Sequence, residues 1–337
     1  MKAEFGADKV FDFSIGNPDV PPPAKFSTVL RELVEQEEPG VHGYMANAGF
    51  PFVREAIATR LSAEQQVSFT ANDLLMTCGA AGGLNVLFKA LLDPGDEVMV
   101  FAPYFVEYRF YVDNHGGEVK VVATDADFNL DLKAIEAALS PKTKIVLINS
   151  PNNPTGQIYP AADLQALGRL LDEAGKRFGT TIYLVSDEPY RNIVFDNHVV
   201  PPLMTATTNA IIASSYSKEL SLPGERIGYL AVHPQMADKG QVVGAMTVAT
   251  RILGFVNAPA RMQRAVARLQ DVSADSSIYA RRLEAFCTVL DGAGISYVRP
   301  KGAFYLFPQA PIDDDVEFCR LLAEQKLLAE PGRGIGK

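Results

Sequence analysis

Short apolar runs bounded by turn-forming residues recur along the middle of the chain. The clearest four are Glu97–Ala102, Val119–Ala123, Lys144–Ser150 and Thr181–Ser186. Between the last two lies Asp163–Phe178, in which apolar residues recur with the period of an amphipathic helix. Runs that are apolar at nearly every position are typical of strands buried on both faces. Since such strands alternate here with a helical pattern, we expect a mostly parallel sheet covered by helices on both sides.

The pattern extends towards both ends of the chain. Leu74–Cys78 is a short strand-like run, and the small residues that follow it open a helix that continues to about Leu92. Pro51 falls in the first turn of an earlier predicted helix. The later chain predicts one long helix and three further elements: Ala260–Leu290, then strands at Ile295–Val298 and Phe304–Phe307, then a helix at Val316–Leu328. These segments predict an antiparallel α/β lobe.

The expected fold class is α/β. A three-layer large domain with a mostly parallel sheet is expected to carry a smaller α/β domain formed by the chain ends. The chain has 337 residues, which is longer than a typical single domain. The expected limits are an N-terminal segment over residues 1–40 that joins the small domain, a large domain over 41–259 and a small C-terminal domain over 260–337.

Composition narrows the class of protein. Hydrophobic residues make up 47% of the chain and charged residues 21%, and the formal net charge is −9. Without a general basic field we expect small-molecule partners rather than nucleic acid. The three cysteines form no Cys-x-x-Cys pair and the N-terminus has no apolar signal core, which predicts a cytoplasmic protein without a membrane anchor. The four histidines show no metal-ligand spacing, so no metal site is predicted.

A lysine lies at the end of an apolar run that carries several hydroxyl groups. The run Ala210–Ala213 continues as Ser214-Ser215-Tyr216-Ser217-Lys218, and Arg226 follows after a Pro-Gly turn. Lysine can form a Schiff base with an aldehyde, while arginine and serine hydroxyls bind phosphate oxygens. The stretch therefore suits an aldehyde cofactor that carries a phosphate. The alternative is a buried strand that runs into a polar turn with a solvated lysine.

Other polar residues follow the predicted strands, where ligands bind in open α/β sheets. Asn153 lies in a loop restricted by two prolines and a glycine, so its amide loses little entropy on binding. Asp187 ends an apolar strand, where a buried carboxylate needs a cationic partner; a helix N-cap is the alternative. The small residues after Cys78 bring backbone amides within reach of an anion, although tight packing also favours such residues.

These motifs resemble the fold-type I pyridoxal-phosphate-dependent aminotransferases of class I and II, the family that includes aspartate aminotransferase. The resemblance rests on Ser-Tyr-Ser-Lys before Pro-Gly-x-Arg-x-Gly, on Asn-Pro-Thr-Gly and on the residues around Asp187. It implies that Lys218 holds pyridoxal 5'-phosphate as a Schiff base and that Asp187 pairs with the ring nitrogen. The further contacts it implies are Asn153 and Tyr190 on the ring oxygen, Phe105 stacked on the ring (or Tyr104, if the register differs by one), and Arg226, Ser215, Ser217 and the backbone of Ala80 and Ala81 on the phosphate.

The resemblance also extends beyond a single chain. Tyr44 is similar to a tyrosine that contacts the cofactor phosphate of the neighbouring subunit, which implies a homodimer with shared active sites. Gly16 matches a glycine whose backbone amide binds the substrate carboxylate together with Asn153; a plain linker glycine is the alternative. The family's arginine for this carboxylate is absent from the sequence, so we expect a chain truncated at both ends or one that lacks this anchor. Arg251 is expected at the surface or in the dimer interface.

The expected function is transfer of an amino group between an α-amino acid and a 2-oxo acid, with Lys218, Asp187 and Tyr190 as the catalytic residues. Two alternatives remain open on the sequence. One is a C–S lyase or another eliminase on the same fold. The other is a regulatory module that binds the cofactor without turnover, although the chain has no basic DNA-binding segment.

Overall fold

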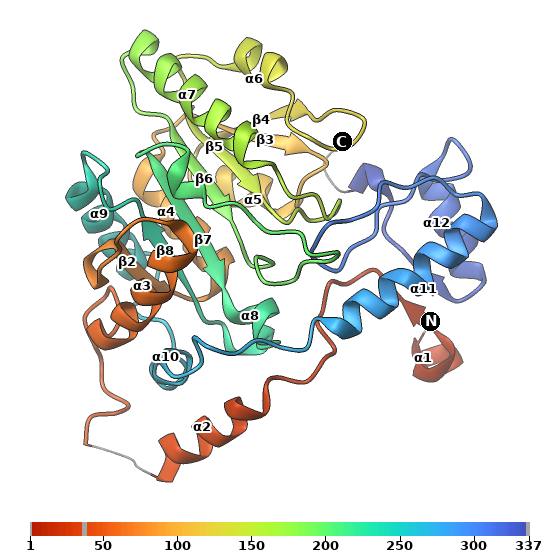
Figure 1. Cartoon of the computed structure of the whole chain (residues 1–337), viewed down its shortest axis with the longest axis horizontal. Coiled ribbons are helices and arrows are strands. Elements are labelled where there is room, and N and C mark those ends of the chain that lie inside the picture. The colour runs from red at the N-terminus through yellow and green to blue at the C-terminus, as the bar shows by residue number, and fades with distance from the viewer. Residues whose placement is uncertain (1, 36–38, 335–337) are drawn as a thin grey trace.

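A seven-stranded sheet forms the centre of the molecule in the part of the chain that the structure describes (Figure 1). The computed structural model describes residues 2–35 and 39–334. The strands are β2 (Leu74–Thr77), β3 (Glu97–Ala102), β4 (Glu118–Ala123), β5 (Thr143–Asn149), β6 (Tyr183–Asp187), β7 (Ala210–Ser215) and β8 (Gly228–Val232). Their order is β2-β8-β7-β6-β5-β3-β4, and β8 runs antiparallel to both of its neighbours. The other pairs are parallel, which confirms the predicted sheet.

Helices cover both faces of this sheet. One layer holds α4 (Gly79–Leu91), α5 (Glu107–Asp113) and α9 (Lys239–Ile252), and the other holds α3 (Pro51–Gln65), α6 (Leu132–Ala138), α7 (Ala161–Phe178) and α10 (Ala260–Ala267), with α2 (Ala24–Glu35) packed on α10. Successive strand residues alternate between the layers: Leu74 and Met76 pack on the α3 side and Leu75 on the α4 side. Because both faces are buried, the strands are apolar at nearly every position.

The carboxyl ends of the parallel strands meet at one edge of the sheet, and this edge positions the candidate site. Asn149 ends β5, Asp187 ends β6 and Ser215 ends β7. The strand register places Asn149 beside Asp187. A short helix, α8 (Tyr216–Glu219), continues directly from β7 and carries Lys218. Parallel pairing therefore brings together residues that lie far apart in the sequence.

The two ends of the chain form a smaller α/β lobe beside the sheet (Figure 1). Its elements are β1 (Phe11–Asp12), β9 (Leu327–Leu328), α1 (Lys2–Phe5), α11 (Ser277–Ala293) and α12 (Asp315–Glu324). β1 pairs with β9. An apolar core joins Tyr279 and Leu283 of α11 to Tyr190 and Ile193 in the loop after β6. The predicted α/β fold with a smaller lobe from the chain ends is confirmed.

Short 3-10 helices also occur, at Ala7–Lys9, Ala71–Asp73, Leu203–Thr205, Pro223–Glu225 and Gly332–Gly334. Within the described residues, no helix has both the length and the apolar character needed to cross a membrane. The expected domain limits stay a prediction. Met1 and residues 36–38 and 335–337, which those ranges include, lie outside the described residues.

The single long helix expected over residues 260–290 is wrong. α10 ends at Ala267 and α11 begins at Ser277, and the residues between them pass from the sheet core to the smaller lobe. Ala274 donates its backbone N–H to the carbonyl oxygen of Glu219 at 2.7 Å, which holds this crossing beside α8. The Asp275 side chain accepts the N–H of Ser277 at 3.0 Å. That local bond satisfies a backbone group at the start of α11, so a new helix begins there.

The strands expected over residues 295–298 and 304–307 are also wrong. Isolated bridges take their place. Pro300 and Pro308 lack the N–H that a strand ladder needs. Ala303 has a φ of +59°, which lies in the left-handed region rather than the extended one. The chain therefore turns at this point.

The smaller lobe differs from its prediction in two further respects. Its two-stranded sheet is parallel rather than antiparallel, because it pairs the beginning of the chain with the end. The helix expected over Val316–Leu328 ends at Glu324. Lys326 adopts a φ of +64°, which turns the chain out of the helix and into β9.

Candidate active site

Lys218 lies just beyond the buried strand β7, and its side chain is itself largely covered. Its Nζ donates a hydrogen bond to the carbonyl oxygen of Gly16 at 2.6 Å and lies 5.4 Å from the centre of the Phe304 ring. Burial, and then the positive charge of Arg226, lower the pKa of Lys218 to about 8, against an opposing effect of Asp187. A lysine with this pKa is partly uncharged near neutral pH and can act as a nucleophile. A fully solvated lysine does not fit this position.

Asp187 is buried at the end of β6, with one side-chain oxygen bonded and the other free. Oδ2 accepts a hydrogen bond from the Tyr108 hydroxyl at 2.7 Å. The buried Oδ1 has no hydrogen-bond partner among the described residues. Burial raises the pKa of Asp187 to about 7, although the bond from Tyr108 lowers it. Since an ionised carboxylate is costly here without a cation, the free oxygen marks a place where a ligand's positive charge would be stabilised.

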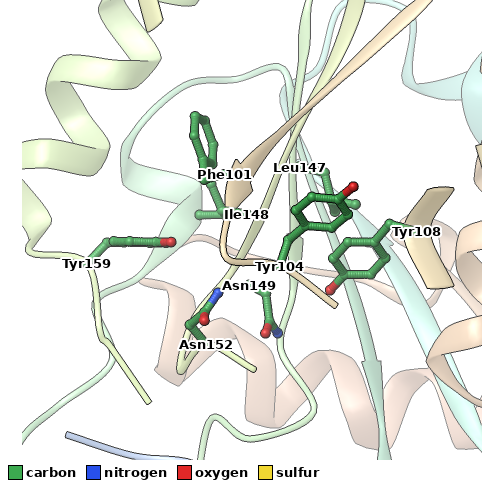
Figure 2. A pocket seen from close by; sticks show the side chains of 8 residues that line it. All are labelled: Phe101, Tyr104, Tyr108, Leu147, Ile148, Asn149, Asn152 and Tyr159. Atoms are coloured by element: carbon green, nitrogen blue, oxygen red, sulfur yellow. The ribbon is translucent and has the colours of Figure 1, made fainter. Parts of the chain in front are cut away.

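Asn149 joins the loop that carries Asn153 to the end of β6. Its amide nitrogen donates to the carbonyl oxygen of Asp187 at 2.7 Å, and its Oδ1 accepts the backbone N–H of Asn153 at 2.5 Å. Figure 2 shows Asn149 with Asn152 and Tyr108 around a cavity of about 10 Å³. A space of that size holds about one water molecule, so it is not a cofactor pocket. Asn149 therefore positions two of the predicted site residues relative to each other.

Two aromatic residues follow β3, and they differ in burial. Tyr104 is 3% exposed and lines the small cavity (Figure 2). Phe105 is half-buried, and its ring meets the Tyr108 ring edge-to-face with the centres 5.4 Å apart. A ring enclosed by core atoms has no face to offer a ligand, so the structure favours Phe105 as the stacking residue.

Arg226 lies against the start of α4. A Cβ atom built on Gly79 would be 2.8 Å from a guanidinium nitrogen of Arg226, so the missing side chain leaves the room that the arginine occupies. Gly79 also has a φ of +74°, which disfavours any other residue. Backbone N–H groups in the first turn of α4, including those of Ala80 and Ala81, have no partner within the helix. The guanidinium and the helix N-terminus are thus placed where they could together bind an anion.

Ser215 lies near this anion site, and Ser217 follows it by two residues, in α8. Ser215 pairs with Gly228 in the sheet, and a Cβ on Gly228 would lie 3.0 Å from the Cα of Gly79. Both serines are buried. The end of β7 and the start of α4 are thus in contact, as a shared phosphate site requires.

Tyr190 and Gly16 meet at Tyr305, a residue that sequence reasoning missed. The hydroxyl oxygens of Tyr190 and Tyr305 are 2.7 Å apart. A Cβ on Gly16 would lie 2.1 Å from the Tyr305 oxygen, so glycine is required at this close approach. Tyr190 is expected to bond a ligand oxygen beside Asn153; its bond in this structure is to Tyr305.

Tyr44 lies at the surface of the single chain. Its side chain is 93% exposed. With Phe255 and residues 256–260 it lines a surface depression of about 230 Å³. Arg251, on α9, is exposed as well.

Sequence reasoning missed Tyr108, Asn149 and Tyr305. Asn149 carried a signal, since it is a polar residue at the end of an apolar strand. Tyr108 follows Phe105 by three residues, a spacing that helical core packing also produces, and Tyr305 has no local signal. Across residues 2–35 and 39–334, no group of three or more His, Cys, Asp or Glu is arranged to hold a metal ion.

The sheet topology and the position of the lysine define a fold-type I enzyme, and comparison with known proteins narrows the class. Residues 8–337 match the family model of aminotransferase class I and II. The chain is 34% identical over 335 residues to an aspartate aminotransferase of Thermotoga maritima, covering 98% of this chain and 85% of that protein. It is 32% identical over 323 residues to an aspartate/prephenate aminotransferase of Thermus thermophilus, covering 94% and 81%. A crystal structure of an aminotransferase from Eubacterium rectale matches with a TM-score of 0.96 at 37% identity, covering 99% and 85%.

The chain belongs to the class I and II aminotransferase family. It is a fold-type I aminotransferase, a transferase of nitrogenous groups. The family predicted from the motifs around Lys218, Asp187 and Asn153 is confirmed.

Proposed function

We propose that this protein binds pyridoxal phosphate at Lys218 and moves an amino group between an α-amino acid and a 2-oxo acid. The observation that carries the proposal is the free Oδ1 of Asp187, which is buried and has no partner among the described residues. A protonated pyridine nitrogen would supply the missing cation and lower the pKa of this carboxyl again. The lowered pKa of Lys218 and the place of Arg226 at the start of α4 support attachment and phosphate binding at the same site.

When bound, the cofactor supplies an aldehyde that condenses with amines and a ring that accepts the electron pair released at the substrate Cα. Lys218 would hold the cofactor through its aldehyde group, and its Nζ, once released, would be placed to move a proton to and from the substrate Cα. Asp187 would keep the ring nitrogen protonated. Asn153 and Tyr190 would donate hydrogen bonds to the ring oxygen, and Phe105 would pack on the ring face.

The phosphate is proposed to bind between β7 and α4. Its partners are the side chains of Arg226, Ser215 and Ser217 and the backbone amides of Ala80 and Ala81. The planar guanidinium matches two phosphate oxygens at once, and the dipole of α4 adds to the attraction. These contacts would orient the ring towards Phe105 and the end of β6.

The substrate's α-carboxylate is proposed to bind the backbone amide of Gly16 and the side chain of Asn153. The bond from Lys218 to the carbonyl oxygen of Gly16 supports this, because it places Gly16 next to the reacting amine. Relatives are named aspartate aminotransferase and aspartate/prephenate aminotransferase. These names make aspartate the first amino donor to test.

We also propose a cytoplasmic homodimer in which Tyr44 of each chain contacts the cofactor phosphate of its partner. The nearly complete exposure of Tyr44 supports this, and α9 exposes Val248 and Ile252 four residues apart on one face. Exposed apolar side chains gathered in this way are typical of an interaction surface. The three unpaired cysteines fit a reducing compartment.

The test is to load purified protein with pyridoxal phosphate and follow the visible absorbance of the bound cofactor. A band that aspartate bleaches and 2-oxoglutarate restores supports amino-group transfer. Lys218→Ala is expected to abolish the band. Lys133→Ala, at an exposed position of α6, is the matched control and is expected to leave it unchanged.

Three results would contradict parts of the proposal. Release of pyruvate with ammonia or thiol from a sulfur amino acid would indicate elimination. Binding of the cofactor without turnover of any donor in a panel of amino acids would indicate a regulatory role. A band retained by Lys218→Ala would refute the assignment of the attachment point.

A further inference from the structure

The segment Pro300–Tyr305 lies between the two loops that the proposed function places at the cofactor ring. Two backbone N–H groups of this segment donate to the carbonyl oxygen of Gly156, at 2.9 and 3.0 Å. A third, from Ala303, donates to the carbonyl oxygen of Ile193 at 2.9 Å. Gly156 belongs to the loop after β5 and Ile193 to the loop after β6. The segment is therefore bonded to both loops at once.

Ala303 fixes the direction in which the next two residues point. It is fully buried and has a φ of +59°, a conformation that residues other than glycine rarely adopt. Such a conformation persists only where the surroundings hold it in place. The turn places the rings of Phe304 and Tyr305 edge-to-face against Tyr190, with centres 5.5 and 5.6 Å away.

The Tyr305 hydroxyl touches both the proposed ring-oxygen donor and the proposed carboxylate site. It is 2.7 Å from the Tyr190 hydroxyl, and it fills the space where a side chain on Gly16 would begin. Lys218 in turn bonds the carbonyl oxygen of Gly16 at 2.6 Å. Tyr305 therefore links the proposed ring-oxygen donor to the proposed carboxylate site, and Lys218 also lies near both, with its Nζ 6.0 Å from the centre of the Tyr190 ring.

A phenol hydroxyl has one hydrogen to donate, and its oxygen can accept another hydrogen bond. When Tyr190 gives its hydrogen to the ring oxygen of the cofactor, the bond between the two tyrosines must be donated by Tyr305. We propose that Tyr305 is a positioning residue that orients Tyr190 and strengthens the bond Tyr190 gives to the ring oxygen. The inference rests on the proposed function, since it needs a cofactor ring beside Tyr190.

The proposal has a spectroscopic consequence. A hydrogen bond from Tyr190 withdraws negative charge from the ring oxygen, which then holds less firmly the proton it shares with the Lys218 nitrogen. Removing that bond raises the pH at which the visible spectrum of the loaded protein changes. A hydrogen bond donated into Tyr190 strengthens the effect, because successive hydrogen bonds polarise one another.

The experiment is a pH titration of the visible absorbance of four loaded proteins: the wild type, Tyr190→Phe, Tyr305→Phe and the double variant. Tyr190→Phe is expected to raise the midpoint by about 1–2 pH units, as expected for a hydrogen bond to a charged group. Tyr305→Phe is expected to raise it by about a fifth of that, roughly 0.2–0.4 units. The double variant is expected to match Tyr190→Phe, because Tyr305 acts through Tyr190.

Tyr279→Phe is the matched control. Tyr279 stacks on Phe304 with centres 5.0 Å apart, and its buried hydroxyl has no partner among the described residues. Its removal is expected to leave the midpoint unchanged. The other charged groups that face the tyrosine pair are Asp187, Lys218 and Glu330, and all of them are retained in every variant.

Two outcomes would overturn the inference alone: a Tyr305→Phe midpoint equal to that of the wild type, or a Tyr305→Phe shift that persists on top of the Tyr190→Phe shift. The first would show that Tyr305 does not influence Tyr190, and the second that it acts by another route. Absence of a visible band in the loaded wild type would overturn the proposed function, and this inference with it.

Discussion

Tyr108→Phe is expected to weaken the binding of pyridoxal phosphate by raising the pKa of Asp187. The substitution removes one buried hydroxyl and keeps the ring that packs beside it. In the structure this hydroxyl donates to Oδ2 of Asp187 at 2.7 Å and opposes the effect of burial, which has raised the pKa of the carboxyl to about 7. In the variant the bond from Tyr108 no longer offsets burial, so the pKa of Asp187 is expected to rise further.

The size of the effect follows from this one hydrogen bond. A hydrogen bond to a charged group contributes about 1.5–3 kcal/mol, or about 1–2 pKa units, so the pKa of Asp187 is expected to rise to about 8–9. At pH 7 the ionised fraction then falls from about one half to between about one tenth and one hundredth. Because the protonated ring nitrogen is proposed to pair with the ionised form of Asp187, affinity at pH 7 is expected to fall by about 5–50-fold. At about pH 9.5 the carboxyl is largely ionised in both proteins, so most of the difference is expected to disappear.

The assay is an equilibrium titration of cofactor-free protein with pyridoxal phosphate at both pH values. Tyr159→Phe is the control, since Tyr159 is also a buried tyrosine and lines the same small cavity as Tyr108 (Figure 2), whereas the bond to Asp187 comes from Tyr108. Equal affinities of wild type and Tyr108→Phe at pH 7 would refute the reasoning. So would a loss of the same size at both pH values, because the hydroxyl would then act by something other than ionisation of Asp187.

Three further substitutions test other parts of the site. Asp187→Asn is expected to stabilise the cofactor-free protein by up to about 4 kcal/mol at pH 8. The pKa of Asp187 is about 7 in the folded protein and 3.8 in the unfolded chain, so ionisation of this carboxyl above pH 7 favours the unfolded chain. Urea unfolding should show the gain fade towards pH 4, and an equal gain at both values would contradict this origin. Gly16→Ala is expected to raise KM for the amino donor by about tenfold, since the new Cβ would lie 2.1 Å from the Tyr305 oxygen and displace it; an unchanged KM in steady-state kinetics counts against it. Arg60→Ala is expected to lower the free energy of unfolding by about 3–5 kcal/mol. Its guanidinium is 2.8 Å from the nearly buried Glu219 carboxylate, which would lose its cation, and an unaltered denaturant midpoint would exclude that role.

The candidate site could be proposed from the sequence because most of its residues lie at or just after strand ends. Strands buried on both faces are visible as apolar runs, and the first polar residues after each run identify the edge where ligands bind. Asp187, Asn153 and Lys218 follow from this rule together with the family motifs. Because parallel strands end at the same edge of the sheet, their pairing brings these three residues together there.

Contacts between distant segments could not be predicted in the same way. Tyr305 bonds Tyr190 across 115 positions of the chain, and no local pattern reports such a contact. Tyr108 lies on α5 at a spacing that ordinary core packing also produces. The break between α10 and α11 did carry a signal, an Asp275 followed by two serines. The apolar periodicity on both sides of it favoured a continuous helix, and only the contact of Ala274 with α8 reveals the crossing.

The pairing of β1 with β9 has a consequence for the synthesis of the protein on the ribosome. Roughly 300 residues separate the two strands, and at about 5–20 residues per second their translation takes about 15–60 s. During that time Phe11 has no strand partner, while the strands of the large sheet emerge and pair. Gly16 lies four residues after β1, so the strand pairing that anchors this part of the chain can form only after Leu327 and Leu328 have been made. We therefore expect a nascent chain to lack the substrate contact proposed for Gly16 until that point, even when Lys218 is already in position.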